Sequence, residues 1–208
     1  MQSLLTPRYS LVVPVYRNAE SIPDLLAAID LLSREFDQRL EAIFVVDGSP
    51  DASYALLRDA LPGVAFPSRL VSLSRNFGSF AAIREGLRHA RGEYVAVMAA
   101  DLQEPPELVA RFFAALREGD VDVVFGIREA RDDPWRTRMA SGLFWGLYRR
   151  FVQPEVPPGG VDVFAVNRVF LERLVAFEEA NGSLLGLLFW MGGRRRFLPY
   201  VRQRRQHG

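Results

Sequence analysis

Runs of apolar residues alternate with amphipathic segments along the first 127 residues of this 208-residue chain. The runs consist mainly of Val, Ile, Leu and Phe and lack the apolar–polar alternation of a half-exposed strand. Such runs are typical of parallel strands that helices cover on both faces. The order therefore predicts an α/β protein with a mostly parallel sheet and helices on each face. The expected strands are 10–16, 41–47, 69–74, 94–98 and 122–127, and the expected helices are 22–32, 52–61, 79–91 and 106–118.

The pattern is less regular after residue 127. We expect an Arg-rich loop, an aromatic helix near 143–151, a strand near 161–166, helices from Arg168 and near 183–191, and a closing strand. A chain of this length buries one sizeable core, so a single domain over 1–208 is expected. Its expected halves are 1–127 and 128–208.

Three local signals predict helix ends. Ser21 and Asp24 have the Ser-x-x-Asp spacing of an N-terminal helix cap. Gly92 and Gly119 follow two predicted helices, and glycine is the commonest residue just beyond a helix C-terminus.

The composition excludes several classes of function. A formal net charge of +1 gives no indication of nucleic-acid binding, and the absence of cysteine excludes a thiol nucleophile or a thiolate metal site. The chain contains no Gly-x-Gly-x-x-Gly, Gly-Lys-Ser/Thr or Gly-x-Ser-x-Gly sequence, which argues against a dinucleotide-binding protein, a P-loop protein and a serine hydrolase. No apolar run reaches the roughly 18–20 residues that a membrane helix needs.

Polar residues follow the carboxyl ends of five predicted strands. Because the carboxyl ends of parallel strands meet at one edge of the sheet, these residues are expected to line one crevice. Each residue alone is an ordinary loop residue, and only their joint occurrence predicts a ligand site. They are Tyr16, Asn18, Asp47, Ser74–Asn76, Asp101 and Arg128.

The segment 97–107 is the most specific of these strand ends. Asp101 follows a buried strand, Gln103 comes two residues later, and two prolines begin the next helix. A carboxylate and an amide oxygen at this spacing suit a hard divalent cation, Mg²⁺ or Mn²⁺, that holds a diphosphate. The segment therefore predicts nucleotide-sugar chemistry with Asp101 and Gln103 as metal ligands.

Four motifs carry a resemblance to a known family. They are Val-Val-Pro-Val-Tyr (12–16), Val-Asp-Gly-Ser-Pro-Asp (46–51), Leu-Ser-Arg-Asn-Phe-Gly (73–78) and Ala-Ala-Asp-Leu-Gln-Glu-Pro-Pro-Glu (99–107). In this order they resemble the successive motifs of family-two glycosyltransferases. The similarity is greatest to the polyprenyl-phosphate branch, which includes dolichyl-phosphate mannose synthase and bacterial undecaprenyl-phosphate sugar transferases. The resemblance covers essentially the whole chain and implies a GT-A fold with a Rossmann-like sheet.

The resemblance also implies roles for individual residues. The nucleotide sugar would be held by Pro14, Tyr16, Asn18, Asp47, Ala100 and Asp101, and the metal by Asp101 and Gln103. The phosphate of the acceptor would be held by Arg128, Arg138 and Ser141, so Asp101 and Arg128 are the expected catalytic residues.

The implied partners are a nucleoside-diphosphate sugar, a polyprenyl phosphate and a membrane surface, with a homo-oligomer left open. The implied location is the cytoplasmic face of the inner membrane, with a membrane region after residue 208. Residues 180–208 contain six Arg and no acidic residue. This stretch predicts either a surface for anionic lipid or a charged edge strand that runs into the terminus.

Two positions depart from the family pattern. Val46 stands where the family usually has an Asp, and Ala99 replaces the first acid of an Asp-x-Asp sequence. Two alternatives therefore stay open. One is a transferase of the same fold with a saccharide hydroxyl acceptor and Asp162 as the base. The other is a non-catalytic nucleotide-sugar-binding subunit of envelope-glycan assembly.

Overall fold

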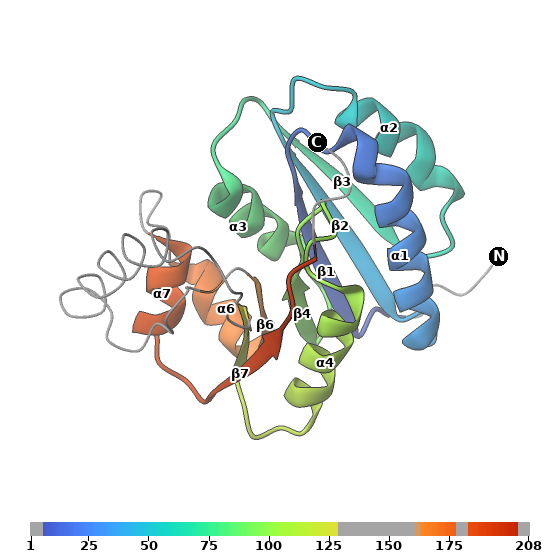
Figure 1. Cartoon of the computed structure of the whole chain (residues 1–208). Coiled ribbons are helices and arrows are strands. Elements are labelled where there is room, and N and C mark those ends of the chain that lie inside the picture. The colour runs from blue at the N-terminus through green and yellow to red at the C-terminus, as the bar shows by residue number, and fades with distance from the viewer. Residues whose placement is uncertain (1–5, 129–160, 162, 178–182, 204–208) are drawn as a thin grey trace, which may run out of the picture.

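The computed structural model describes residues 6–128, 161, 163–177 and 183–203. Within them, one seven-stranded sheet has the strand order β3-β2-β1-β4-β6-β5-β7 (Figure 1). The strands are β1 (Tyr9–Val15), β2 (Leu40–Asp47), β3 (Ser68–Leu73), β4 (Tyr94–Val97), β5 (Val123–Arg128), β6 (Val163–Asn167) and β7 (Arg195–Tyr200). The α-helices are α1 (Ile22–Glu35), α2 (Ser53–Ala60), α3 (Ser79–His89), α4 (Pro106–Arg117), α6 (Arg168–Ala176) and α7 (Leu184–Trp190).

The sheet is mostly parallel, as predicted. β1 pairs in parallel with both β2 and β4, β2 with β3, and β5 with β7. Only β6 runs the other way, between β4 and β5. The carboxyl ends of β1 to β5 therefore lie at the same edge of the sheet, where the polar residues were expected.

Helices cover both faces of the sheet (Figure 1). One apolar cluster packs α1, α2 and α4 against one face, and a second packs α3, α6 and α7 against the other. Every residue of β2 is buried, which explains the continuous apolar run 42–46 at its centre. Helix α1 buries Ile22, Leu25, Ile29 and Leu32, a helical stripe whose side chains each contribute about 1.5–3 kcal/mol by leaving water.

The predictions for the helix ends have different outcomes. The prediction that Gly119 caps a helix is confirmed, since Gly119 follows α4 with a φ of +80°. Ser21 is wrong as a side-chain cap: its backbone is already helical, at φ −85° and ψ −14°, because the 3₁₀ turn Ala19–Ser21 runs directly into α1. The predicted helix near 143–151 lies outside the described residues.

Gly92 is also wrong as a helix cap. Helix α3 ends at His89, and Ala90 is already extended. Gly92 is required for a different reason: a Cβ there would lie 2.7 Å from the carbonyl carbon of Tyr9 and 2.8 Å from the Ser10 nitrogen. The glycine thus allows the turn before β4 to touch the start of β1.

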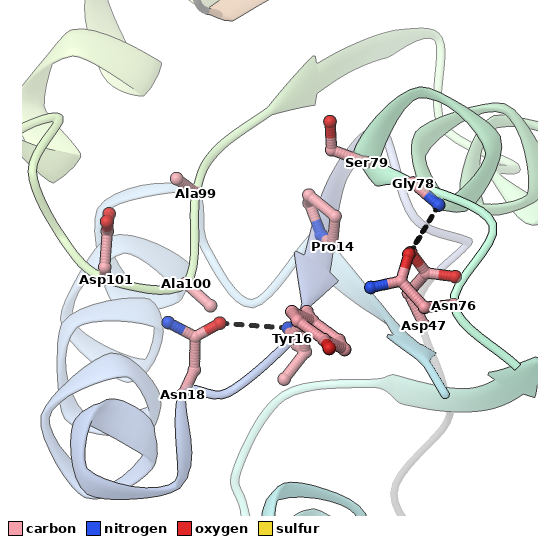
Figure 2. Close-up of a pocket in the computed structure, with 11 residues that line it drawn as sticks. Pro14, Tyr16, Asn18, Asp47, Asn76, Gly78, Ser79, Ala99, Ala100 and Asp101 are labelled. Carbon is pink, nitrogen blue, oxygen red and sulfur yellow. Dashed lines mark hydrogen bonds between the residues drawn. The ribbon is translucent and has the colours of Figure 1, made fainter. Parts of the chain in front are cut away.

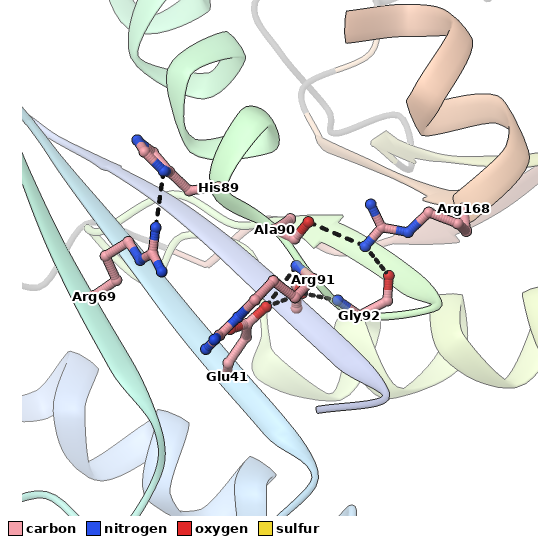
Figure 3. Close-up of polar contacts among 8 residues, drawn as sticks. Glu41, Arg69, His89, Ala90, Arg91, Gly92 and Arg168 are labelled. Carbon is pink, nitrogen blue, oxygen red and sulfur yellow. Dashed lines mark hydrogen bonds and ion pairs between the residues drawn. The ribbon is translucent and has the colours of Figure 1, made fainter. Parts of the chain in front are cut away.

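A polar cluster around the buried Glu41 joins several elements at the amino edge of the sheet (Figure 3). Glu41 is 3% exposed, and its Oε1 accepts hydrogen bonds from the Ser10 hydroxyl and the Arg91 amide, both at 2.7 Å. Its Oε2 accepts from the Arg91 guanidinium at 3.1 and 2.9 Å. Arg168 of α6 donates to main-chain carbonyls in the 90–92 turn. The cluster therefore joins β1, β2, the turn before β4 and α6.

Candidate active site

A pocket of about 250 Å³ opens at the carboxyl edge of the sheet (Figure 2). It is built from the end of β1, the last residue of β2, the loop between β3 and α3, and the loop after β4. All six residues predicted to hold a nucleotide sugar line it. The lining residues are Pro14, Val15, Tyr16, Asn18, Asp47, Asn76, Gly78, Ser79, Ala99, Ala100 and Asp101.

The chain reverses sharply after β1, which brings Asn18 back to the pocket. Arg17 makes the turn with a φ of +55°. Asn18 is 8% exposed, and its Oδ1 accepts the main-chain N–H of Tyr16 at 3.0 Å. Because the amide oxygen faces that N–H, the Nδ2 group is the donor that Asn18 can offer to a ligand.

The 49–53 turn supports this loop from outside the pocket. Ser49 Oγ accepts the Arg17 amide at 2.8 Å, Ser53 Oγ accepts the Asn18 amide at 3.2 Å, and Asp51 accepts the Ala19 amide at 3.0 Å. Burial opposes ionisation of Asp51, but hydrogen bonds from Ser49, Ser53 and main-chain amides outweigh it and lower the pKa of Asp51 to about 2. The carboxylate is thus ionised and fixed near neutral pH.

Asp47 holds the loop between β3 and α3. It is 3% exposed, and its two oxygens accept the amides of Phe77 and Gly78, each at 2.8 Å. Gly48 has a φ of +56°, and a Cβ there would lie 2.2 Å from the carbonyl carbon of Arg75. Asp47 and Gly48 together therefore hold the loop between β3 and α3. The Asp47 carboxylate binds main-chain amides of this loop, and the absence of a side chain at Gly48 leaves room for its backbone.

The loop after β4 places Asp101 in the pocket. Asp101 Oδ1 accepts the Gln103 amide at 3.3 Å, and the intervening Leu102 has a φ of +54°. Figure 2 shows Asp101 and Asp47 on opposite sides of the pocket, with Pro14 and Tyr16 between them.

The donor set available to a cation is small. Ala99, where the family has an acid, also lines the pocket. Within the described part of the chain, no group of three or more His, Cys, Asp or Glu side chains could hold a metal ion. The Asp101 carboxylate and the Gln103 amide oxygen, two residues apart on one loop, are the hard oxygen donors that fit Mg²⁺ or Mn²⁺, so most ligands would have to come from water and a diphosphate.

Gln103 does not line the pocket. Its side-chain oxygen accepts a hydrogen bond from the Arg202 guanidinium, and its main-chain oxygen accepts the amide of Gln203 at 2.9 Å. A metal role for Gln103 would therefore require its side chain to leave Arg202.

Of the residues predicted for the acceptor, Arg128 alone lies within the described part of the structure. Arg128 is the exposed last residue of β5, opposite Tyr200 of β7, and does not line the pocket. Arg138, Ser141 and Asp162 lie outside the described residues. In the part of the chain that the structure describes, no helix is both long and apolar enough to cross a membrane.

Several residues that shape the pocket are not predicted by the sequence pattern. Gly78 and Ser79 at the start of α3 line it, and the Ser49-Asp51-Ser53 set supports its β1 loop. The Ser-Pro-Asp-Ala-Ser sequence is itself a turn signal, since Asp and Ser side chains commonly bind nearby main-chain amides. That signal reveals the turn but not the loop that it supports.

Three curated relatives are similar to this chain. An undecaprenyl-phosphate 4-deoxy-4-formamido-L-arabinose transferase of Aeromonas hydrophila is 40% identical over 174 residues, which are 83% of this chain and 52% of the relative. A bactoprenol glucosyl transferase of Shigella phage SfX is 31% identical over 209 residues, covering 97% of this chain and 66% of the relative. An uncharacterized Bacillus subtilis glycosyltransferase, YkcC, is 30% identical, and the chain spans 62% of its length.

Solved structures share the fold. A mannosyltransferase from Pyrobaculum calidifontis in complex with GDP-Man and Mn²⁺ has a TM-score of 0.66 and 24% identity, covering 95% of this chain and 56% of the other. Glucosyl-3-phosphoglycerate synthase from Mycobacterium tuberculosis, in complex with Mn²⁺, UDP and glucosyl-3-phosphoglycerate, has a TM-score of 0.61 and 19% identity, covering 97% and 73%. At these identities the similarity concerns the fold alone.

The sequence model described as "Glycosyl transferase family 2" matches residues 10–175. The match extends from β1 to α6 and includes every strand that contributes to the pocket. It confirms the resemblance inferred from the four motifs: the chain belongs to glycosyl transferase family 2.

Proposed function

We propose that this chain is the catalytic region of a glycosyltransferase that moves a sugar from a nucleoside-diphosphate sugar to a polyprenyl phosphate at the cytoplasmic surface of a membrane. One observation carries the proposal: all six residues expected to hold the donor line a single pocket at the carboxyl edge of the sheet. The similarity to undecaprenyl-phosphate and bactoprenol transferases supports a polyprenyl phosphate as the acceptor. The GDP-Man and UDP complexes of the structural neighbours support the donor.

The pocket offers complementary groups to a nucleoside diphosphate. Tyr16 presents an aromatic ring, Asn18 presents the Nδ2 donor, and Asp47 anchors the loop that forms the opposite wall. A divalent cation bound by Asp101, with Gln103 as a second ligand, would offset the charge that develops on the leaving nucleoside diphosphate. Asp101 would hold that diphosphate at the end of β4, away from Asp47.

A phosphate acceptor simplifies the chemistry that the protein must provide. The second pKa of a phosphate monoester is about 6, so near neutral pH the acceptor is largely a dianion. One of its oxygens would form a bond to the anomeric carbon as the bond to the diphosphate breaks, with inversion at that carbon. No general base is needed, and the task of the protein is alignment by Arg128, Arg138 and the Ser141 hydroxyl.

The acceptor role of Arg128 can be tested in the complete natural protein, with a short-chain prenyl phosphate as the acceptor. Arg128→Ala should lower transfer by roughly 10–100-fold, equivalent to about 1.4–2.7 kcal/mol, while donor affinity stays nearly unchanged. Arg128→Lys should recover only part of the rate because lysine lacks the planar fork. Arg117→Ala, on the exposed end of α4, is the control. An equal loss of donor binding and transfer would assign Arg128 to the diphosphate and favour the hydroxyl acceptor with Asp162 as base.

The donor and cation roles can be tested without turnover. UDP or GDP with Mn²⁺ or Mg²⁺ should raise the melting temperature, with about 2.7 kcal/mol of stabilisation at 100 times Kd. Asp101→Ala should remove the cation-dependent part of that increase, whereas Glu172→Ala, an exposed acid on α6, should not. A cation response that survives in Asp101→Ala would refute the assignment.

Ala99 favours a second candidate, a non-catalytic subunit that binds nucleotide sugars, because a carboxylate is missing from the pocket. The complete protein separates the two. Turnover of a nucleotide sugar in the presence of prenyl phosphate requires an enzyme, whereas saturable binding without turnover would support the subunit.

A further inference from the structure

Gln103 connects the loop that carries Asp101 with residues 199–203, here called the C-terminal segment. Its main-chain N–H donates to Asp101 Oδ1 at 3.3 Å, and its main-chain oxygen accepts the amide of Gln203 at 2.9 Å. Its side-chain oxygen accepts from the guanidinium of Arg202. Gln103 thus uses its main chain and its side chain to join two parts of the chain that lie 99 residues apart.

The C-terminal segment is itself well anchored. It continues from β7, which pairs with β5 as far as Tyr200, and Tyr200 is only 3% exposed. Arg111 of α4 donates to the carbonyl oxygen of Pro199 at 3.0 Å. Arg202 is therefore delivered to a defined position beside Gln103 by elements that do not form the pocket.

The backbone of the Asp101 loop needs such support. Leu102 has a φ of +54°, a conformation that costs a non-glycine residue on the order of 1–3 kcal/mol. It persists only where neighbouring contacts determine it. The three hydrogen bonds made by Gln103, the next residue, supply contacts of this kind.

The Arg202 contact also has a chemical consequence. The oxygen that accepts from the guanidinium is the one that a divalent cation at Asp101 and Gln103 would need. A guanidinium and a divalent cation repel each other, and Ala99 leaves few negative charges to offset that repulsion.

We propose that Arg202 is a positioning residue that competes with the divalent cation for the side-chain oxygen of Gln103. In the cation-free protein it holds the Asp101 loop in place. It also lowers the affinity for a cation alone, so that strong cation binding requires the diphosphate of the donor. This inference rests on the proposed function only through the cation site at Asp101.

Binding of Mn²⁺ tests the competition independently of activity. The free ion is measured by electron paramagnetic resonance, with and without UDP, in wild type and three variants whose folding is checked by circular dichroism. Arg202→Gln removes the charge, Arg202→Lys keeps it, and Arg111→Gln removes a different anchor of the same segment.

Arg202→Gln should raise the affinity for Mn²⁺ without UDP by about 5–20-fold, as estimated for a +1 and a +2 charge roughly 5 Å apart in a water-like dielectric. Arg202→Lys and Arg111→Gln should have nearly the wild-type affinity for Mn²⁺. Addition of UDP should reduce the difference in Mn²⁺ affinity between Arg202→Gln and wild type.

Several outcomes would overturn the competition. Wild-type affinity in a folded Arg202→Gln variant would do so while leaving the cation site intact. Reduced affinity in that variant would show that Arg202 instead organises the cation site. Absence of Mn²⁺ binding from wild type and Arg202→Gln alike, even with UDP, would overturn both this inference and the proposed cation. Binding by Arg202→Gln alone would support the competition.

Discussion

Asp47 offers the sharpest test of how the pocket is held together. Its carboxylate accepts two main-chain amides from the loop that forms one wall, and no other side chain of β2 lines the pocket. Asp47→Ala should therefore loosen the Phe77–Gly78 wall and weaken nucleotide binding at the same time. Asp47→Asn should behave almost as badly, because its amide NH₂ would face a main-chain N–H that also donates.

The size of the effect follows from the contacts. A hydrogen bond to a charged group contributes about 1.5–3 kcal/mol, so two such bonds set an upper range of about 3–6 kcal/mol. Phe77 is 48% exposed, so its loop can recover hydrogen bonds from water after the carboxylate is removed. Asn76 also accepts the Gly78 amide, at 2.9 Å. We therefore expect a loss of about 2–3 kcal/mol in the free energy of unfolding and of about 1.5–3 kcal/mol in binding of UDP or GDP.

Urea unfolding and calorimetric titration with the nucleotide measure the two losses separately. Asp59→Asn, an exposed acid of α2 whose partner is Arg58, is the matched control and should change neither quantity. Asn76→Ala should cost less than Asp47→Ala because the carboxylate remains. If the free energy of unfolding of Asp47→Ala lies within about 0.5 kcal/mol of the wild-type value, Asp47 does not hold the loop. If the affinity for UDP or GDP stays within about twofold of wild type, Asp47 has no role in nucleotide binding.

Two further predictions concern stability away from the pocket. Glu41→Gln should lower the free energy of unfolding by about 2 kcal/mol, because an NH₂ donor replaces one of the two carboxylate oxygens that accept from Arg91. The affinity for UDP should not change. An unchanged free energy of unfolding in urea would contradict this prediction. Hydrogen bonds from Arg194 lower the pKa of Asp122 to about 2, below its unfolded value of 3.8, so this stabilisation is complete above about pH 4 and disappears as the pH falls toward 2. Wild type should lose about 1–2 kcal/mol more than Asp122→Asn between pH 5 and pH 2.5, and equal losses in urea unfolding would refute the role of Asp122.

The sheet and the grouping of Tyr16, Asp47 and Asp101 around one pocket could be predicted because their signals are local. Continuous apolar runs predicted the strands, and the topology of a parallel sheet then brought Tyr16, Asp47 and Asp101 to one edge without knowledge of any contact. The errors arose where a local pattern had another cause. Ser21 is the last residue of a 3₁₀ turn and has helical backbone angles, and Gly92 is needed for contact with β1 instead of for a helix cap.

The contacts that position the loops could not be predicted, because their partners are distant in sequence. Gln103 and Arg202 are 99 residues apart, and Asp47 is about 30 residues from the amides that it holds. Nothing in the spacing of either pair indicates a contact. The spacing of Gln103 from Asp101 and the family resemblance predict a metal role for Gln103, but neither indicates that its side chain contacts Arg202.

Residues in the left-handed backbone conformation show which loops depend on contacts with residues distant in sequence. Among the residues that the structure describes, four other than glycine have positive φ angles. Asp37 and Gln38 follow the C-terminus of α1, and the Gln38 amide donates to the main-chain oxygen of Ser33, so the helix itself stabilises them. Arg17 and Leu102 follow no helix.

Arg17 and Leu102 both lie beside the pocket, on loops held by other parts of the chain. The Arg17 amide donates to Ser49, and the loop of Leu102 is held through Gln103. Backbone strain that is supported from outside is common where a site must be held in one geometry before its ligand binds. In this protein the strain lies on the Asn18 and Asp101 loops, and the contacts that maintain it come from the 49–53 turn and the C-terminal segment. These two supports are therefore the places where substitutions outside the pocket should alter binding within it.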